Sequence, residues 1–314
     1  MNKIKFTFIG AVDTGKSSCC GQILAKANWI DERSLQKIFD TADKDKMTKS
    51  KWARVLDVFE EEILRGKTHE YINIDFTYND QEYELIDTPG HLIFIREMIA
   101  GICGVQIACL LVSMLSNEFD ASFERGTLKE HLIIARASGV EKIILLANKM
   151  DLISWNKDIY NANCEKVIQF LTKIGFLKTD IITIPISAWF GIGLCDTINM
   201  PEWYTGKCLL EELKNIKCKP VDIIKNIKGT KFVIDTRIAN YPSIITIGFN
   251  AIFHIGGKEY ESELIGLKDH KFIKNGDKCI TLWKLNDEYE LTSDRVIIRK
   301  DTKTIGIGKI IKTL

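Results

Sequence analysis

The sequence has little proline, little histidine and almost no net charge. Its 314 residues include 5 prolines and 5 histidines, and 43 lysines and arginines oppose 42 aspartates and glutamates. A formal net charge of +1 argues against nucleic-acid binding through bulk charge, although a local basic patch is compatible with it. The nine cysteines contain no CxxC pair, which favours buried reduced thiols over a zinc site or a disulfide framework.

Long hydrophobic runs are also missing. The most apolar stretch, Met98–Met114, contains glycines and is shorter than the ~20 residues of a typical membrane span. It is typical of a helix end, a turn and a buried strand. The N-terminus leads directly into a predicted strand, without the apolar core and cleavage site of a signal peptide. We therefore expect a soluble, cytoplasmic protein with no membrane contact.

Apolar strands alternate with amphipathic helices over the first two thirds of the chain. Because strands that are buried on both faces read as continuous apolar runs, this alternation predicts a mostly parallel sheet with helices on both faces. The predicted strands are Lys5–Ile9, Val105–Ser113, Lys142–Ala147 and Ile181–Ile186. The predicted helices are Gly15–Lys26 and Lys129–Ser138, and a hairpin of Tyr71–Tyr78 and Glu82–Ile86 turns at Asn79-Asp80.

The last third has a different pattern. Lysines cluster around Pro220, and strand-like segments of period two then alternate with turn signals at Gly256-Gly257, Asn275-Gly276-Asp277 and Asn286-Asp287. This pattern predicts one small antiparallel β-barrel. We therefore expect an α/β domain at 1–213, a linker at 214–230 and a barrel at 231–314.

A glycine-rich segment follows the first predicted strand. Gly10-Ala-Val-Asp-Thr-Gly-Lys16-Ser17 fits GxxxxGK[ST] between a strand and a helix, which is the context of a phosphate-binding loop. Backbone N–H groups of such a loop hold the α- and β-phosphates, the lysine reaches the β- and γ-phosphates, and the Ser17 hydroxyl binds Mg²⁺. The predicted nucleotide-binding residues of this loop are Val12, Asp13, Thr14, Gly15, Lys16, Ser17 and Ser18.

Three further segments fit a guanine nucleotide. Asp87-Thr-Pro-Gly90 follows an apolar strand, so Asp87 is placed to hold Mg²⁺ through water and the Gly90 amide to contact the γ-phosphate. In Asn148-Lys-Met-Asp151 the carboxylate can accept hydrogen bonds from guanine N1 and N2, donors that adenine lacks. A backbone N–H of Ser187-Ala188 would then serve O6. The predicted base-binding residues are Asn148, Lys149, Asp151, Ser187, Ala188 and Trp189.

These motifs together resemble the translation GTPases of the elongation factor 1-alpha and elongation factor Tu family. The resemblance covers nearly all of residues 1–213. It rests on the phosphate loop, on Asp87-Thr-Pro-Gly-His91 for the family's Asp-x-Pro-Gly-His, and on Arg65-Gly-Lys-Thr68 for Arg-Gly-Ile-Thr. The segment Met200-Pro with Trp203-Tyr-x-Gly206 is most similar to the eukaryotic and archaeal branch.

The resemblance implies a P-loop GTPase domain that binds GTP or GDP with Mg²⁺. It implies that Thr68 closes over Mg²⁺ and the γ-phosphate, and that His91 positions the attacking water as the catalytic residue. Lys67 departs from the family, which has an apolar gate residue there. Its ammonium either stabilises transition-state charge or points into solvent and leaves the gate open.

The family places two barrels after the GTPase domain, and residues 231–314 resemble only the second. The matching segments are Pro242-x-x-Ile245-x-x-Gly248-Phe249, Phe272-Ile-Lys-Asn-Gly276-Asp277, Arg295-x-x-x-Arg299 and Thr304-Ile-Gly-Ile-Gly308. In the family the first barrel holds the aminoacyl end of tRNA, so its loss implies that this chain does not carry aminoacyl-tRNA in the usual manner. Surfaces that the lost barrel once covered would favour a homo-oligomer or a protein contact.

Two kinds of function remain open. One is a GTP-hydrolysing, translation-factor-like switch that is slow without a partner such as the ribosome. The other is a GTP-dependent binding or regulatory module with little turnover, comparable to the family's mRNA-surveillance branches or to a decoy for a ribosomal or exchange-factor partner.

Overall fold

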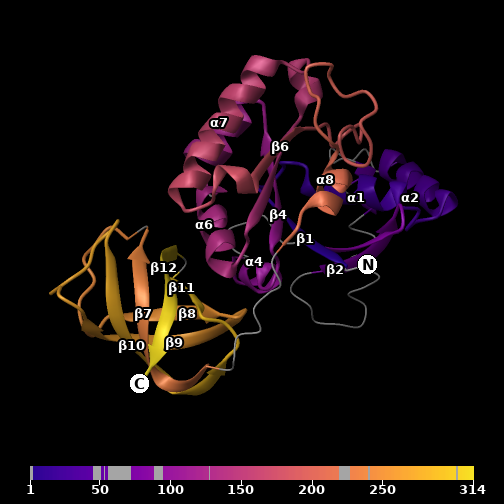
Figure 1. Cartoon of the computed structure of the whole chain (residues 1–314). Helices are drawn as coiled ribbons and strands as arrows, with labels where there is room; N and C mark the ends of the chain where they lie inside the picture. Colours follow the sequence, from indigo (N-terminus) through magenta and orange to yellow (C-terminus); the bar gives the residue numbers. More distant parts are fainter. Residues whose placement is uncertain are drawn as a thin grey trace. The chain divides into compact units, whose positions relative to one another are not determined.

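The computed structural model of the chain is shown in Figure 1. It describes residues 3–44, 51–52, 54–55, 72–87, 95–126, 128–218, 227–239, 241–301 and 303–314. The chain divides into two compact units. The first contains Met1–Gly101, Val105–His131 and Glu141–Cys218, and the second contains Ile102–Gly104, Leu132–Val140 and Lys219–Leu314.

The first unit is built on a six-stranded sheet with the order β2-β3-β1-β4-β5-β6. Strands β3, β1, β4, β5 and β6 run parallel, and β2 pairs antiparallel with β3. The predicted mostly parallel sheet is therefore confirmed. The strands are β1 (Ile4–Ile9), β2 (Ile72–Tyr78), β3 (Gln81–Asp87), β4 (Ile107–Ser113), β5 (Lys142–Asn148) and β6 (Ile181–Pro185).

The central strands are apolar throughout because helices cover both faces of the sheet. All seven residues of β4 are buried. On one face Phe8, Cys109 and Leu146 form a core with residues of the first and last helices of the unit. The helix after β5 packs against β5 and β6, and Figure 1 shows it on the opposite side of the sheet from the first helix.

The described helices of this part of the chain have the following bounds. They are α1 (Lys16–Lys26), α2 (Glu32–Lys44), α4 (Ile95–Ile102), α5 (Ser116–Phe119), α6 (Leu128–Ser138), α7 (Lys157–Lys173) and α8 (Leu209–Asn215), with shorter turns η2 (Asp120–Glu124), η3 (Met150–Ile153) and η4 (Lys178–Asp180). Helix α7, which the sequence patterns did not predict, starts at an N-cap. Asn156 Oδ1 accepts hydrogen bonds from the amides of Asp158 at 2.9 Å and Ile159 at 3.0 Å.

The second unit contains a closed antiparallel barrel with the strand order β10-β7-β12-β11-β8-β9. This confirms the predicted single barrel. The strands are β7 (Ile227–Ile238), β8 (Asn250–Ile255), β9 (Lys258–Leu267), β10 (Lys278–Leu291), β11 (Arg295–Lys300) and β12 (Lys303–Thr313). Phe232, Phe253 and Trp283 fill its interior, and Gly256-Gly257 make the β8–β9 turn with positive φ.

One predicted turn is wrong. Asn286-Asp287 lie inside β10, where the pairing with β7 shifts register between Lys284 and Tyr289. A bulge places polar turn-type residues within a strand, and a sequence pattern does not distinguish this from a reversal of the chain.

Candidate functional site

The predicted phosphate loop connects the carboxyl end of β1 to the amino end of α1. Gly15 is the N-cap of α1 and has φ 99°, and Asp13 also has a left-handed φ of 60°. A Cβ at Gly15 would overlap Asn148 Nδ2, and one at Gly10 would lie 2.8 Å from the Leu111 carbonyl oxygen. Both glycines are therefore needed for the close backbone approaches that shape this loop.

Lys16 turns back over the loop that precedes it. Its Nζ donates hydrogen bonds to the carbonyl oxygens of Gly10 at 2.9 Å and Ala11 at 2.7 Å. The Thr14 hydroxyl donates to the same Ala11 oxygen at 2.9 Å. These bonds hold the Lys16 ammonium over the loop at the amino end of α1. The ammonium charge and the helix dipole both favour the binding of an anion there.

Asn148 ties the predicted base motif to the phosphate loop. Its Nδ2 donates to the Thr14 carbonyl oxygen at 2.7 Å, and its Oδ1 accepts from the Ala188 amide at 2.9 Å. The side chain is 2% exposed. Three segments that are far apart in the sequence therefore meet at this one buried amide, at the carboxyl edge of the parallel strands.

The 187–192 segment is shaped by two further contacts. Ser187 and Ile192 pair across a tight turn, and Ser187 Oγ accepts from the Phe190 amide at 3.4 Å. Gln22 of α1 donates to the carbonyl oxygen of Trp189 at 2.9 Å. Gly191 has φ 71°, and a Cβ there would lie 2.8 Å from Gln22 Oε1. Trp189 is 57% exposed, so this residue is accessible to a ligand.

Lys149 and Asp151 follow Asn148 at the end of β5. Lys149 has a left-handed φ of 64°, and Asp151 lies in η3. Lys149 Nζ contacts both carboxylate oxygens of Glu118 in α5, at 2.9 and 2.6 Å. The Ala188 amide, predicted as a donor to guanine O6, is already bonded to Asn148. Gln22 and Glu118 belong to no recognised motif, and only the fold brings them to this site.

The predicted metal and catalytic residues are described only in part. Asp87 is the last residue of β3, and β3 pairs with β1 so that Phe8 and Asp87 are register partners. Asp87 therefore ends its strand beside the phosphate loop, although only its backbone is described. Thr68, Gly90 and His91, together with Lys67, lie outside the described residues.

One buried histidine lies in the same unit. His131 of α6 is 1% exposed, and neither ring nitrogen has a hydrogen-bond partner among the described residues. Burial, with a smaller effect of the Lys16 charge, lowers the pKa of His131 to about 4. The imidazole is therefore neutral at physiological pH.

In the part of the chain that the structure describes, no group of three or more acidic, His or Cys side chains is placed to hold a metal.

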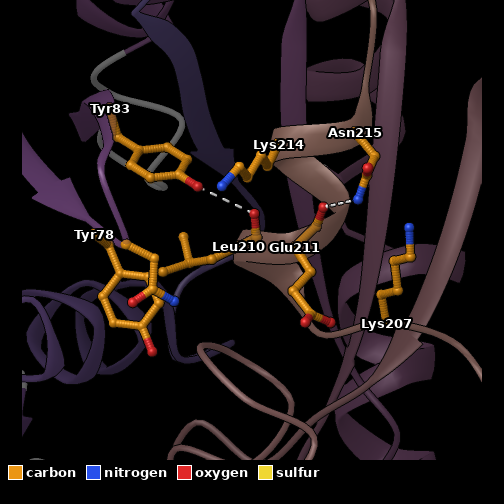
Figure 2. Close-up of a pocket in the computed structure, with 8 residues that line it drawn as sticks. Tyr78, Tyr83, Lys207, Leu210, Glu211, Lys214 and Asn215 are labelled. Carbon is orange, nitrogen blue, oxygen red and sulfur yellow. Dashed lines mark hydrogen bonds between the residues drawn. The ribbon is translucent and has the colours of Figure 1, made fainter. Parts of the chain in front are cut away.

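A pocket of about 260 Å³ opens at the other end of the sheet (Figure 2). Tyr83 donates to the Leu210 carbonyl oxygen at 3.2 Å across it. Its lining residues are Tyr78, Asn79, Tyr83, Lys207, Leu210, Glu211, Lys214 and Asn215. Since the β2–β3 turn lies beside the amino end of β1, this pocket is separate from the phosphate loop, which follows the carboxyl end of β1.

The fold and this site together define a P-loop nucleotide-binding protein with a barrel attached. The family model "Elongation factor Tu GTP binding domain" matches residues 1–219. The chain belongs to this family of translation GTPases, and the predicted resemblance is confirmed. Among the helices of the described residues, none is both long and apolar enough to cross a membrane.

Two kinds of curated relatives match the chain. The eukaryotic peptide chain release factor GTP-binding subunit of Candida maltosa is 36% identical over 220 residues, which are 68% of this chain and 31% of that protein. Elongation factor 1-alpha of Ignicoccus hospitalis is 34% identical over 244 residues, 76% of this chain and 54% of that protein. The match to the release-factor subunits thus spans about a third of their length, and the chain is related to both groups.

Solved structures show the same fold. The S. cerevisiae Ski7 GTPase-like domain, bound to GDP and inorganic phosphate, superposes with a TM-score of 0.79 at 14% identity and covers 98% of this chain and 97% of that one. A structure of sup35 complexed with GDP gives a TM-score of 0.50 at 20% identity, over 100% of this chain and 95% of that chain. At these identities the similarity concerns fold alone.

Proposed function

We propose that this chain binds GTP and GDP with Mg²⁺ and hydrolyses GTP slowly by itself, as a translation-factor-like switch. The observation that carries the proposal is the Asn148 bridge, because it joins a phosphate loop and a base-recognition turn at one edge of the sheet. GTP-binding sites of this class need both parts at a fixed separation.

Each part of the site has a proposed role. The loop amides and Lys16 bind the phosphates, the Asp151 carboxylate accepts from guanine N1 and N2, and Lys149 and Trp189 border the base. Rejection of ATP follows because an adenine would leave the Asp151 carboxylate without donors. The proposed nucleotide-binding residues are Val12, Asp13, Thr14, Gly15, Lys16, Ser17, Ser18, Gly90, Asn148, Lys149, Asp151, Ser187, Ala188 and Trp189.

The residues at the loop suit a hard divalent cation. Ser17 is the second residue of α1, Asp87 ends the neighbouring strand, and both offer oxygen ligands of the kind that Mg²⁺ prefers. We assign Ser17, Thr68 and Asp87 to Mg²⁺. The ion supplies charge neutralisation at the phosphates.

His91 is the proposed catalytic residue. It would orient the attacking water toward the γ-phosphate, and since phosphoryl transfer depends mainly on positioning and charge, one such residue can set the rate. The test is single-turnover hydrolysis by His91→Ala, with His270→Ala as a control on an exposed barrel histidine. A large fall in rate with little change in GTP affinity supports the role, and an unchanged rate removes His91 from the mechanism.

The domain content favours a role other than conventional aminoacyl-tRNA delivery. We assign residues 1–213 to the GTPase domain, 214–230 to a linker and 231–314 to the barrel. One closed barrel is present in the described residues. We propose that the barrel that holds the aminoacyl end in the family has no counterpart among the described residues, so that this chain would not bind the aminoacyl end in the usual manner.

A second candidate is a GTP-dependent binding module with little turnover, acting on the ribosome, on surveillance factors or as a homo-oligomer. It is favoured by Lys67 in place of an apolar gate residue and by the fold similarity to the Ski7 GTPase-like domain. Single-turnover GTP hydrolysis with and without ribosomes separates the two. Ribosome-stimulated hydrolysis supports the switch, whereas tight GTP binding without turnover under either condition supports the binding module.

A further inference from the structure

Glu118 stands outside every motif of the nucleotide site, yet it holds one of that site's residues. Both of its carboxylate oxygens accept hydrogen bonds from Lys149 Nζ, at 2.9 and 2.6 Å. Lys149 is the residue between Asn148 and η3, so its side chain starts at the centre of the proposed base site. A lysine held by two charge-assisted bonds has a far narrower range of positions than a free one.

The backbone around Glu118 is fixed to the same strand end. The amide of Met114, at the carboxyl end of β4, donates to the Asn148 carbonyl oxygen at 2.9 Å. Phe119 is 1% exposed, and its ring packs at a tilt against that of Phe123, with ring centroids 5.3 Å apart. Glu118 therefore lies between two fixed positions, Met114 and Phe119. Met114 is hydrogen-bonded to Asn148, the residue that precedes Lys149.

The backbone of Lys149 is equally constrained. Its φ of 64° is left-handed, and the next residue, Met150, is fully buried and donates its amide to the Ile186 carbonyl oxygen at 3.2 Å. Because the backbone is held at Glu118 and at Lys149, their ion pair makes a second connection between the segment after β4 and the end of β5. The side chains are 38% and 23% exposed, so water screens the pair only in part.

We propose that Glu118 is a positioning residue for guanine nucleotide binding, which acts by holding Lys149 in place before the nucleotide arrives. This inference rests on the proposed function. Ordering a long lysine side chain in advance removes an entropic cost from binding, so the gain appears in affinity for GTP and GDP alike. It does not alter base selection, because Asp151 is untouched.

A double-mutant cycle tests the assignment. We expect Glu118→Gln to weaken GTP and GDP binding equally, by about tenfold. In the Lys149→Met background the same change should shift affinity by less than about twofold, since no ammonium remains to be held. The GDP-to-IDP affinity ratio should stay constant across the cycle. Fluorescence titration with labelled nucleotides measures all four proteins.

Two controls separate positioning from folding. Glu124 lies in the neighbouring turn, and its carboxylate pairs with Lys129 at 3.3 Å and not with Lys149. Glu124→Gln should therefore leave the affinity for GTP and GDP unchanged. Glu118→Asp keeps the charge on a shorter stem and should give an intermediate loss even if Glu118→Gln folds poorly, as thermal unfolding of ligand-free protein would show. If Glu118→Gln lowers nucleotide affinity equally in the wild-type and Lys149→Met backgrounds, the positioning role of Glu118 is overturned and the proposed function is not. A wild-type chain that binds no guanine nucleotide would overturn the proposed function as well.

Discussion

Asn148 Nδ2 donates a 2.7 Å hydrogen bond to the carbonyl oxygen of Thr14, across 134 residues of sequence. The same side chain accepts from the Ala188 amide. The phosphate loop, the end of β5 and the turn after β6 are therefore held in one arrangement by a buried group. Its removal leaves two buried backbone groups without partners.

Asn148→Ala is expected to weaken GTP and GDP binding together and to lower the free energy of unfolding. Each buried group left unsatisfied costs about 1–3 kcal/mol, so for the two groups together a loss of about 2–6 kcal/mol is expected. Urea unfolding and nucleotide titration measure the two effects. Asn215→Ala is a matched control, since that side chain also donates to a backbone carbonyl oxygen, that of Glu211, but is exposed. Equal effects of the two substitutions would contradict the bridging role of Asn148.

Gln22→Leu should weaken nucleotide binding without changing the hydrolysis rate at saturation. The substitution removes the donor to the Trp189 carbonyl oxygen, so the proposed base-binding turn loses its hydrogen bond to α1. We expect a loss of affinity of about three- to tenfold, equivalent to one hydrogen bond of ordinary strength. Gln169→Leu, on the exposed face of α7, provides the comparison. A changed rate with unchanged affinity would assign Gln22 to a different step.

His131 should make the protein less stable at mildly acidic pH. The pKa of His131 in the fold is about 4, below the ordinary value near 6.5, so the unfolded chain binds the proton more readily. Its stabilising contribution is complete above about pH 6.5 and declines as pH falls toward 4, by about 3 kcal/mol over that range.

Unfolding of wild type and His131→Leu between pH 7.5 and 4.5 measures this dependence. The leucine variant should lose the part of the pH dependence that His131 supplies, while His270→Leu, at an exposed position, should retain it. Parallel curves for wild type and His131→Leu would show that other groups account for the acid sensitivity.

Trp283→Ala should destabilise the barrel. The indole is fully buried, packs on Phe253 with ring centroids 4.8 Å apart, and donates to Thr281 Oγ1 at 2.8 Å. Loss of a buried indole of this size costs about 3–5 kcal/mol. Denaturant unfolding followed by circular dichroism is the measurement. Phe272→Ala removes an aromatic ring that is 46% exposed on the same barrel and should cost less than about 1 kcal/mol.

The sequence predicted the elements whose patterns are local. Continuous apolar runs identified β1, β4, β5 and β6, and the GxxxxGK[ST] string was correctly expected to join a strand to a helix, because these signals depend on neighbouring residues alone. It did not predict α7, whose apolar positions are interrupted by polar ones. It misplaced a turn at Asn286-Asp287 because a register shift in β10 has the same composition as a reversal.

The amino-acid sequence by itself determined the class of fold, the single barrel and the family, since each follows from motifs and periodicity along the chain. Only the tertiary structure decided which side chains support the site. Glu118 reaches Lys149 across 31 residues and Gln22 reaches Trp189 across 167. The order of parallel strands brings such pairs together by placing the carboxyl ends of β1, β4, β5 and β6 at one edge, and no local pattern records that order.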